Sequence, residues 1–490
     1  SMLFPDQTLG GQRLFRALVN RLRTRLRSGA SLETFSRLAN APNFPWNYES
    51  EFVIYQNSDG SFTSSFNYDA VKPSGTTYYV DPVTGNDTTG DGSQGLPFKS
   101  LDKARTSGAV VIRAKGGLYD ENTGFAASFA PSSTNLVVES SDGNVVIITR
   151  AEAGLSYSLV SGAYDAALAA APAAVIDRAV ARAGETLAIG SGNVPTPLTL
   201  AADKATCQAT PGTYFHGSNV LTVNRTGGTA PDAAIVVLPP ALVTNVVAAD
   251  ITIWLKDCEF WGNGAFAWNC ATSNTAKLYA QNCGFRFANA ASDDGLDIDD
   301  ITVVRLKNCH FTDNVADGLS IHRDVAGPTQ TVLCENGHGA RNGTSGGTNF
   351  NGITTHDKTQ YIGLNNVCKD NYGPNIAHTA GTWALELNWN CQNSLGGAAA
   401  FDLQSGSFST VYPAVVFTKN GTSGAGSAAS LSQATGGILI DLGGGTYGAT
   451  IPVSSGSYIV DGTDSFLRDI VTVAPDAFIG MWLPVGTRVD

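Results

Sequence analysis

The sequence is poor in charge, since only 15% of its 490 residues are Asp, Glu, Lys or Arg. It holds 42 acidic against 30 basic residues, which gives a formal net charge of −12 at pH 7. An acidic chain of this kind disfavours nucleic acid and anionic membrane surfaces as partners. It does not exclude an anionic polysaccharide, because Arg, His or a metal ion can meet such a ligand locally.

Long apolar runs are missing as well. No stretch of eighteen apolar residues occurs, so the sequence predicts no membrane-spanning helix. The opening residues SMLFPDQTLGGQRLFRALVNRLRTRLRSG lack the basic-then-apolar order of a signal peptide. They predict instead a short basic amphipathic helix, with Leu14, Leu18 and Leu22 on one face, that packs on its own domain or on a sister subunit; a helix on a membrane surface is the weaker alternative.

What the chain does contain is turn-forming and apolar residues. Gly occurs 54 times and hydrophobic residues make up 43% of the sequence. This composition argues against disorder and favours an all-β protein with many turns. At 490 residues the chain is too long for one ordinary globular core, but a repetitive fold can reach that length as one body.

A repeat organises the second half of the sequence. The segments KDCEF, QNCGF, KNCHF, VLCEN, NVCKD and WNCQN follow one another at spacings of 25, 26, 25, 34 and 23 residues. This period predicts one coil of a right-handed parallel β-helix, with the cysteines stacked in an inward-facing ladder. A disulfide framework is the alternative, since the cysteine count of eight is even. The ladder consists of Cys258, Cys283, Cys309, Cys334, Cys368 and Cys391.

A second column marks another strand of each coil. DGLDIDD, DGLSIHR, NGITTHD and PNIAHTA align through their apolar residues, with an extra loop at 339–350 in the longest step. Because alternate residues of a strand face opposite sides, inward Leu296 sends Asp297 and Asp299 outward. The same parity places His322 and then His356 above Asp299 on later coils, about 4.8 Å apart per coil. The aligned apolar residues are Leu296, Leu319, Ile353 and Ile376.

This polar face is the candidate functional site. A purely structural role is the alternative, because Asp and Asn commonly form ladders in β-helices. The candidate catalytic residues are Asp297, Asp299, His322, His356 and Asp357. The candidate substrate-binding residues are Asp294, Asp317, Arg323, Asp324, Trp261 and Trp268, the tryptophans for stacking on sugar rings.

Three chemistries fit such a face. Two carboxylates can hydrolyse a glycosidic bond as acid and base or nucleophile. A uronate lyase or epimerase needs a base, here His322 or His356, and a cation such as Arg323 to stabilise the enolate. Clustered aspartates could hold calcium, but the sequence lacks a calcium-loop repeat, so we expect no cofactor or metal site.

The stretch TTYYVDPVTGNDTTGDGSQGLPFKSLDKA, a strand, a Gly/Asp turn and a short helix from about Ser100, resembles the opening of many secreted or viral β-helix proteins. The repeat region resembles the pectate-lyase-like superfamily, which covers lyases, hydrolases, epimerases and phage tailspikes. GITTHDKTQYIGLNNV is similar in layout to a segment of alginate epimerases, but Thr354 and Thr355 replace its Asp and Pro. ENGHGAR resembles the Gly-His-Gly of polygalacturonases without their paired motifs, so we interpret His338 as a loop residue.

Four regions follow from these patterns. Residues 1–75 form an N-terminal helical or assembly region, and 76–250 begin the β-helix. That second region carries an inserted helical segment at about 161–190 and a hairpin with a Gly-Ser-Asn turn. Residues 251–415 form the β-helix core, and 416–490 a β-rich terminal cap or assembly region.

The sequence and the resemblance together predict a polysaccharide-binding and -degrading protein. A glycoside hydrolase acting on a bacterial surface or extracellular glycan is the leading interpretation. A uronate lyase or epimerase and a non-catalytic glycan-binding adhesin or tail fibre are the alternatives. The resemblance to tailspikes implies a homotrimer located in a virion or outside the cell, with polysaccharide as the partner and no membrane insertion.

Overall fold

The computed structural model describes strand β1 (Ser36–Arg37) and residues 46–461. The stretches that it leaves out of that range are 122–134, 153, 187–192, 239–243, 248–249, 263–266, 271–274, 289–293, 324–328, 346–349, 358, 380, 404–413, 425, 428, 434–437, 442–445 and 448–457. The predicted basic N-terminal helix lies outside the described residues. No helix in the described part of the chain is long and apolar enough to cross a membrane.

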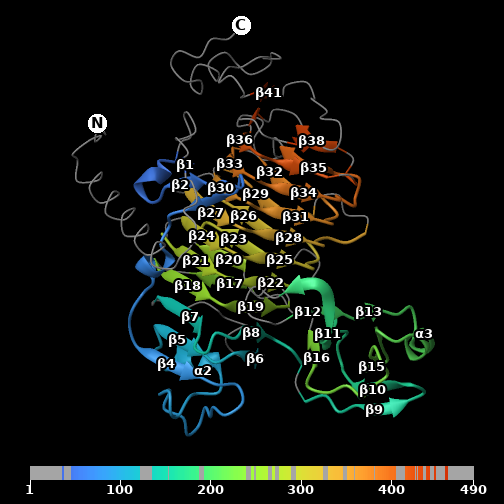
Figure 1. Cartoon of the computed structure of the whole chain (residues 1–490). Coiled ribbons are helices and arrows are strands. Elements are labelled where there is room, and N and C mark those ends of the chain that lie inside the picture. The colour runs from blue at the N-terminus through green and yellow to red at the C-terminus, as the bar shows by residue number, and fades with distance from the viewer. Residues whose placement is uncertain are drawn as a thin grey trace.

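Three long parallel sheets form the body of the molecule, and each coil from β18 to β37 contributes one strand to each of them (Figure 1). The chain therefore forms a right-handed parallel β-helix, as the sequence predicts. The eight-stranded sheet contains β17 (Thr244–Val247), β20 (Ala267–Cys270), β23 (Leu296–Asp299), β26 (Leu319–His322), β29 (Ile353–Thr355), β32 (Ile376–His378), β35 (Ala399–Leu403) and β38 (Ala429–Gln433).

The other two sheets complete the coils. The twelve-stranded sheet contains β4 (Thr77–Val80), β5 (Val111–Ala114), β7 (Leu136–Ser140), β18 (Thr252–Lys256), β21 (Lys277–Gln281), β24 (Val303–Lys307), β27 (Gln330–Glu335), β30 (Thr359–Leu364), β33 (Trp383–Leu387), β36 (Val415–Lys419), β39 (Ile438–Asp441) and β41 (Tyr458–Asp461). The ten-stranded sheet contains β6 (Gly117–Asp120), β8 (Val146–Thr149), β19 (Cys258–Trp261), β22 (Gly284–Arg286), β25 (His310–Thr312), β28 (His338–Ala340), β31 (Val367–Lys369), β34 (Asn390–Gln392), β37 (Thr422–Ser423) and β40 (Thr446–Tyr447). Coils continue to β41, so the predicted boundary at residue 415 is wrong.

The cysteine ladder is correct for its first three members. Glu259 pairs with Gly284 and Gly284 with His310, which stacks Cys258, Cys283 and Cys309 as buried free thiols. The later cysteines leave this column. The next coil takes 28 residues from His310 to His338, so a spacing of 25 places Cys334 on β27 of the twelve-stranded sheet. Cys368 and Cys391 lie side by side on β31 and β34, in the column of Phe311 and Gly339 and not in that of Cys309. All seven described cysteines are free, as the ladder predicts.

The residue before each cysteine of the motifs KNC and QNC has its own role. Asn282 and Asn308 adopt φ of 53°, in the left-handed region that Asn tolerates better than most residues, and turn the chain from the twelve- to the ten-stranded sheet. Their side-chain amides form a ladder in which each Nδ2 donates to the Oδ1 one coil below, at 2.8–3.0 Å. The ladder joins Asp257, Asn282, Asn308, Asn336, Asn365 and Asn388. Stacked turns of this kind hold the coils in register.

An inserted unit separates β8 from β17 (Figure 1). It contains β9 (Ser158–Val160), β10 (Ala163–Ala167), β11 (Ala174–Thr186), β12 (Asn193–Pro197), β13 (Thr199–Leu200), α3 (Lys204–Ala209), β14 (Thr213–Gly217), β15 (Val220–Asn224) and β16 (Ile235–Leu238). The predicted helix at 161–190 is therefore wrong, because the alanine-rich segment forms β10 and β11. Pairing of β11 with β12 and β16 overrides its local helix preference. The predicted hairpin is confirmed, with Ser218 and Asn219 at positive φ in its turn.

Residues 46–72 run along the outer face of the twelve-stranded sheet and are called the strap (Figure 1). The strap contains η1 (Tyr48–Ser50), β2 (Ile54–Gln56), β3 (Phe62–Ser64) and η2 (Tyr68–Val71). Its aromatic residues pack on outward apolar side chains of β27, β30, β33 and β36. The predicted N-terminal helical region is thus wrong for these residues, which cover the solenoid. The chain then enters β4, and α2 (Leu101–Thr106) follows with Ser100 as its N-cap, as predicted.

Arg305 fixes the strap to the solenoid. Its Nη2 donates to Glu51 Oε2 at 2.6 Å, and its guanidinium lies 4.6 Å from the centre of the Trp46 ring. We expect Arg305→Ala to lower the free energy of unfolding by about 1–3 kcal/mol, because it removes a charged hydrogen bond and a cation–π contact from a buried site. Hydrogen exchange in residues 46–72 should accelerate. Arg113→Ala, which removes a half-exposed arginine paired with Glu139, should change neither quantity measurably.

Candidate functional site

The outer face of β23, β26 and β29 carries the predicted polar side chains. Leu296 pairs with Leu319, and Leu319 with Ile353, and all three are fully buried. Alternate residues therefore point outward, and Asp297 and Asp299 are both partly exposed. The strand parity that the sequence predicts is confirmed.

Asp299, His322 and His356 form one column across three coils. Asp299 pairs directly with His322 in the strand register. The rings of His322 and His356 stack with their centres 4.1 Å apart and their planes 8° from parallel. The column extends to Thr379, whose Oγ1 lies 2.9 Å from His356 Nδ1. The alignment of PNIAHTA with NGITTHD places Thr379 one coil after His356, but Thr379 is not among the predicted site residues.

Two carboxylates and one imidazole meet in this face. Asp297, Asp299 and His322 each offer a ligand atom, and these atoms all lie within 4.8 Å of one another. A donor set of two carboxylates and one imidazole suits a divalent transition metal in part, but it falls short of the six to eight oxygens that calcium takes. The same closeness suits acid–base chemistry on one bond of a substrate.

Burial shifts the pKa values of the column. It raises the pKa of Asp299, and the neighbouring His322 opposes this rise. Burial also lowers the pKa of His322, against the pull of Asp299, and lowers that of His356 to about 3. At neutral pH both imidazoles are therefore neutral. Asp299 differs from an ordinary surface aspartate because it holds its proton to a higher pH.

Hydrogen bonds fix the orientation of the side chains. Ser320 Oγ lies 2.9 Å from His322 Nε2 within the same strand. Asn351 Nδ2 donates to Thr354 Oγ1 at 2.8 Å, which ties the next coil to the same face. The contacts of Ser320 with His322 and of Thr379 with His356 hold the two rings in place, so the face is preorganised.

Asp294 and Asp317 lie at the ends where the strands begin, as predicted, but they serve the backbone. The amide of Asp317 donates to Asp294 Oδ1 at 2.7 Å, and that of Asn351 donates to Asp317 Oδ1 at 2.6 Å. Burial raises the pKa of Asp317 to about 6. It also raises the pKa of Asp294, together with repulsion from Asp317. These carboxylates hold the coils together as well as bordering the site.

Arg323 does not reach the exposed edge that the sequence predicts for it. Its side chain is buried, and Nη1 donates to the Asp300 backbone oxygen at 2.7 Å and lies 3.2 Å from Asp300 Oδ1. The guanidinium is drawn inward because Asp300 turns the chain at φ 59° and presents its carbonyl. Asp357, also at positive φ (53°), is partly exposed at the end of β29. Asp324 lies outside the described residues.

Of the two tryptophans predicted to bind sugar, Trp261 is covered by another part of the chain. Trp261 lies on the outer face of the ten-stranded sheet, 2% exposed, and packs under the inserted unit against Phe287. Its substrate-binding role is therefore wrong, because a neighbouring element covers the ring. Trp268 belongs to β20, but its side chain lies outside the described residues. His338 is likewise no loop residue, since it belongs to β28 and its ring centre lies 5.5 Å from that of His310.

A buried polar group behind the site escaped the sequence reading. His378 Nδ1 lies 2.7 Å from Thr355 Oγ1, and His378 Nε2 lies 3.1 Å from Glu386 Oε1, inside the solenoid. Register alone would have found it, because Thr355 and His378 pair directly and have the inward parity of Ile353. These contacts join β29, β32 and β33 behind His356.

Comparisons with known proteins give distant likenesses. No protein-family model and no curated protein matches the chain. Among solved structures, one of XylC with xylose has a TM-score of 0.44 at 12% identity, covering 74% of this chain and 68% of the other. A glycoside hydrolase has a TM-score of 0.35 at 9% identity, covering 79% and 96%. Pectate lyase Pel9A has a TM-score of 0.27 at 13% identity, covering 83% and 85%.

The depressed pKa of His356 predicts a loss of stability in acid. Between pH 6.5 and about 3 the unfolded chain binds a proton that the folded site refuses, so the free energy of unfolding falls as the pH falls. We expect His356→Asn, which keeps a polar atom facing Thr379, to flatten this slope. Urea midpoints measured between pH 3 and pH 8 test it. Equal slopes in both proteins would contradict the assignment.

Proposed function

We propose that the chain is a polysaccharide-degrading enzyme that hydrolyses glycosidic bonds on the outer face of β23, β26 and β29. The observation that carries the proposal is the meeting of Asp297, Asp299 and His322 within 4.8 Å on two adjacent coils. Glycosidases work with a pair of carboxyl groups in different protonation states. Burial raises the pKa of Asp299, which supports its choice as the member of such a pair that carries the proton.

In the proposed reaction Asp299 donates its proton to the glycosidic oxygen as that bond breaks. Asp297 attacks the anomeric carbon and forms a glycosyl ester. Asp299, now ionised, then takes a proton from a water molecule, which attacks the same carbon and releases Asp297. The closeness of the two carboxyl groups supports this retaining course, because an inverting pair stands about 6.5–9.5 Å apart to admit a water between them.

The histidines bind and orient the sugar in this proposal. Both imidazoles are neutral at pH 7, so each ring has one donor and one acceptor nitrogen. His322 Nε2 and His356 Nδ1 contact Ser320 and Thr379, and the other nitrogen of each ring remains for a sugar hydroxyl. Their contacts with Ser320 and Thr379 hold the rings in fixed positions. A rigid face of this kind costs less entropy when a sugar binds.

Hydrolysis is favoured over uronate elimination by the charge on the face. A lyase needs a cation beside the substrate carboxylate to stabilise the enolate. Among the described residues of these three coils, the predicted cation Arg323 is buried against Asp300. The ionised carboxylate of Asp297, which acts as the nucleophile in this proposal, would repel a uronate. We therefore propose a neutral or amino-sugar glycan as the substrate.

A panel of polysaccharides tests the function. The whole chain is incubated with neutral, amino-sugar and uronate glycans, and the products are analysed by mass spectrometry. New reducing ends support hydrolysis. Unsaturated uronates would show that the reaction is a lyase reaction and not hydrolysis. Binding without products would indicate a glycan-binding adhesin or fibre. Proton NMR of the first product distinguishes retention from inversion.

The assembly is a separate proposal. The homotrimer and the virion or extracellular location remain proposals that rest on the tailspike resemblance. Light scattering of the purified whole chain measures the oligomeric state. A monomer at micromolar concentration would contradict the trimer.

A further inference from the structure

Strands β11 and β12 of the inserted unit form an arm along the ten-stranded sheet. Ile176 at the base of the arm and Val194 near its far end pack with Trp261 and Phe287 of the solenoid. Beyond Asp177 most described side chains of β11 are exposed, and the pairing with β12 shifts register twice. Besides the buried Val194, the outer half of the arm has a polar anchor.

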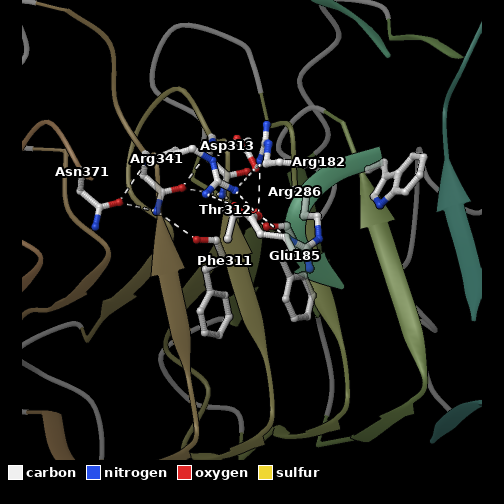
Figure 2. A network of polar contacts seen from close by, with 12 residues as sticks. Arg182, Glu185, Arg286, Phe311, Thr312, Asp313, Arg341 and Asn371 are labelled. Atoms are coloured by element: carbon white, nitrogen blue, oxygen red, sulfur yellow. Dashed lines mark hydrogen bonds and ion pairs between the residues drawn. The ribbon is translucent and has the colours of Figure 1, made fainter. Parts of the chain in front are cut away.

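Four charged residues provide that anchor and are called the latch (Figure 2). Arg341 reaches Glu185 of the arm through Nη1 and Nη2 at 2.7 and 2.8 Å. It also reaches Asp313 through Nε and Nη2 at 2.8 and 2.9 Å. From the arm, Arg182 Nη1 donates to Asp313 Oδ2 at 2.9 Å.

The latch is more than a surface contact. Its side chains are only 10–24% exposed. Arg341 and Arg182 lower the pKa of Asp313 against the effect of burial. Bidentate arginine–carboxylate contacts of this kind have a defined geometry. They therefore both attach the arm to the solenoid and fix its position.

The latch lies at the turns that lead into the candidate site. Asp313 follows β25 and Arg341 follows β28, and these turns continue into β26 and β29. Asp317, at the border of the site, is four residues after Asp313, so their Cα atoms are at most about 14 Å apart. The latch thus joins the arm to the border where the strands of the site begin.

We infer that the arm is a side wall of the candidate site and that the latch, Arg182, Glu185, Asp313 and Arg341, makes the site select long glycan chains over short ones. This inference rests on the proposed function. A short substrate contacts the carboxylates of β23 alone, whereas a polymer also extends past the border and contacts the wall. The latch residues are positioning residues and touch no reacting atom.

The test compares Glu185→Gln and Arg341→Gln with the wild-type chain. We expect KM for the polymeric substrate to rise on the order of tenfold in either variant, and kcat for a short aryl glycoside of the same sugar to change less than twofold. The double variant should raise KM for the polymer no further than Arg341→Gln alone does, because Arg341→Gln already breaks the contact between Arg341 and Glu185. Hydrogen exchange in residues 177–186 should accelerate in the same variants.

Lys204→Gln is the matched control, since it breaks an ion pair with Asp165 in the same unit away from the latch. It should leave both substrates and the arm unchanged. An unchanged polymer KM alongside faster exchange in the arm would overturn the inference while the hydrolysis stands. Loss of activity on both substrates alike would also overturn it. The proposed function fails separately, if neither substrate is cleaved by any of these proteins.

Discussion

Replacing Asp299 by Asn is expected to lower kcat on the true polysaccharide by a hundredfold or more. Removal of a general acid has an effect of about 10²–10⁴. Asparagine keeps the shape of the side chain but has no proton to give to the glycosidic oxygen. Folding should be unaffected, because Asp299 points outward and contributes little to the core. Initial rates and thermal denaturation of the same samples measure both effects.

The matched control is Asp370→Asn, the same change at a turn of the ten-stranded sheet. Asp370 has φ of 59°, a conformation that Asn also adopts, so neither activity nor stability should change. Substituting His322 or His356 by Ala should weaken substrate binding more than it lowers kcat. Normal cleavage by Asp299→Asn would remove Asp299 from the reaction, and a large drop in its melting temperature would point to a structural role instead.

The fold was predictable because a β-helix repeats one local problem. Each coil needs apolar residues facing inward, so Leu296, Leu319 and Ile353 recur at the coil spacing and reveal the period. Strand parity then places Asp299, His322 and His356 in one outward column without any knowledge of the loops. A short motif and a period were sufficient for the part of the site that lies on strands.

Features that depend on contacts between distant segments were not predictable. The burial of Arg323 depends on the turn conformation of Asp300, and that of Trp261 on the inserted unit that covers it. The alanine-rich strand β11 has helical composition, and its partners β12 and β16 alone make it a strand. Cys334 left the ladder because one coil is three residues longer than its cysteine spacing. In each case tertiary pairing decides what local sequence leaves open.

One such contact lies under the arm and predicts the largest effect on stability. Glu259 and Arg286, on adjacent strands of the ten-stranded sheet, form an ion pair in which both side chains are fully buried. Arg286 Nε donates to Glu259 Oε2 at 2.8 Å. Arg286 Nη1 donates to Thr312 Oγ1 at 2.6 Å, and Figure 2 labels these two residues. Gly284, which pairs with Glu259 and lies on the same strand as Arg286, leaves room for the carboxylate, because a Cβ there would collide with it.

We expect Arg286→Met to lower the free energy of unfolding by about 3–5 kcal/mol, since it leaves the Glu259 carboxylate buried without its cation. The double variant Glu259→Leu and Arg286→Met should recover most of this loss, because two buried charges are costly to desolvate and an apolar pair of similar volume is not. Arg105→Met, which breaks the partly exposed pair with Asp102, is the control and should cost less than about 1 kcal/mol. Urea denaturation, with hydrogen exchange followed in β19 and β22, measures the change where it arises. A double variant as unstable as Arg286→Met alone would mean that packing under the inserted unit, rather than charge compensation, determines the stability of this site.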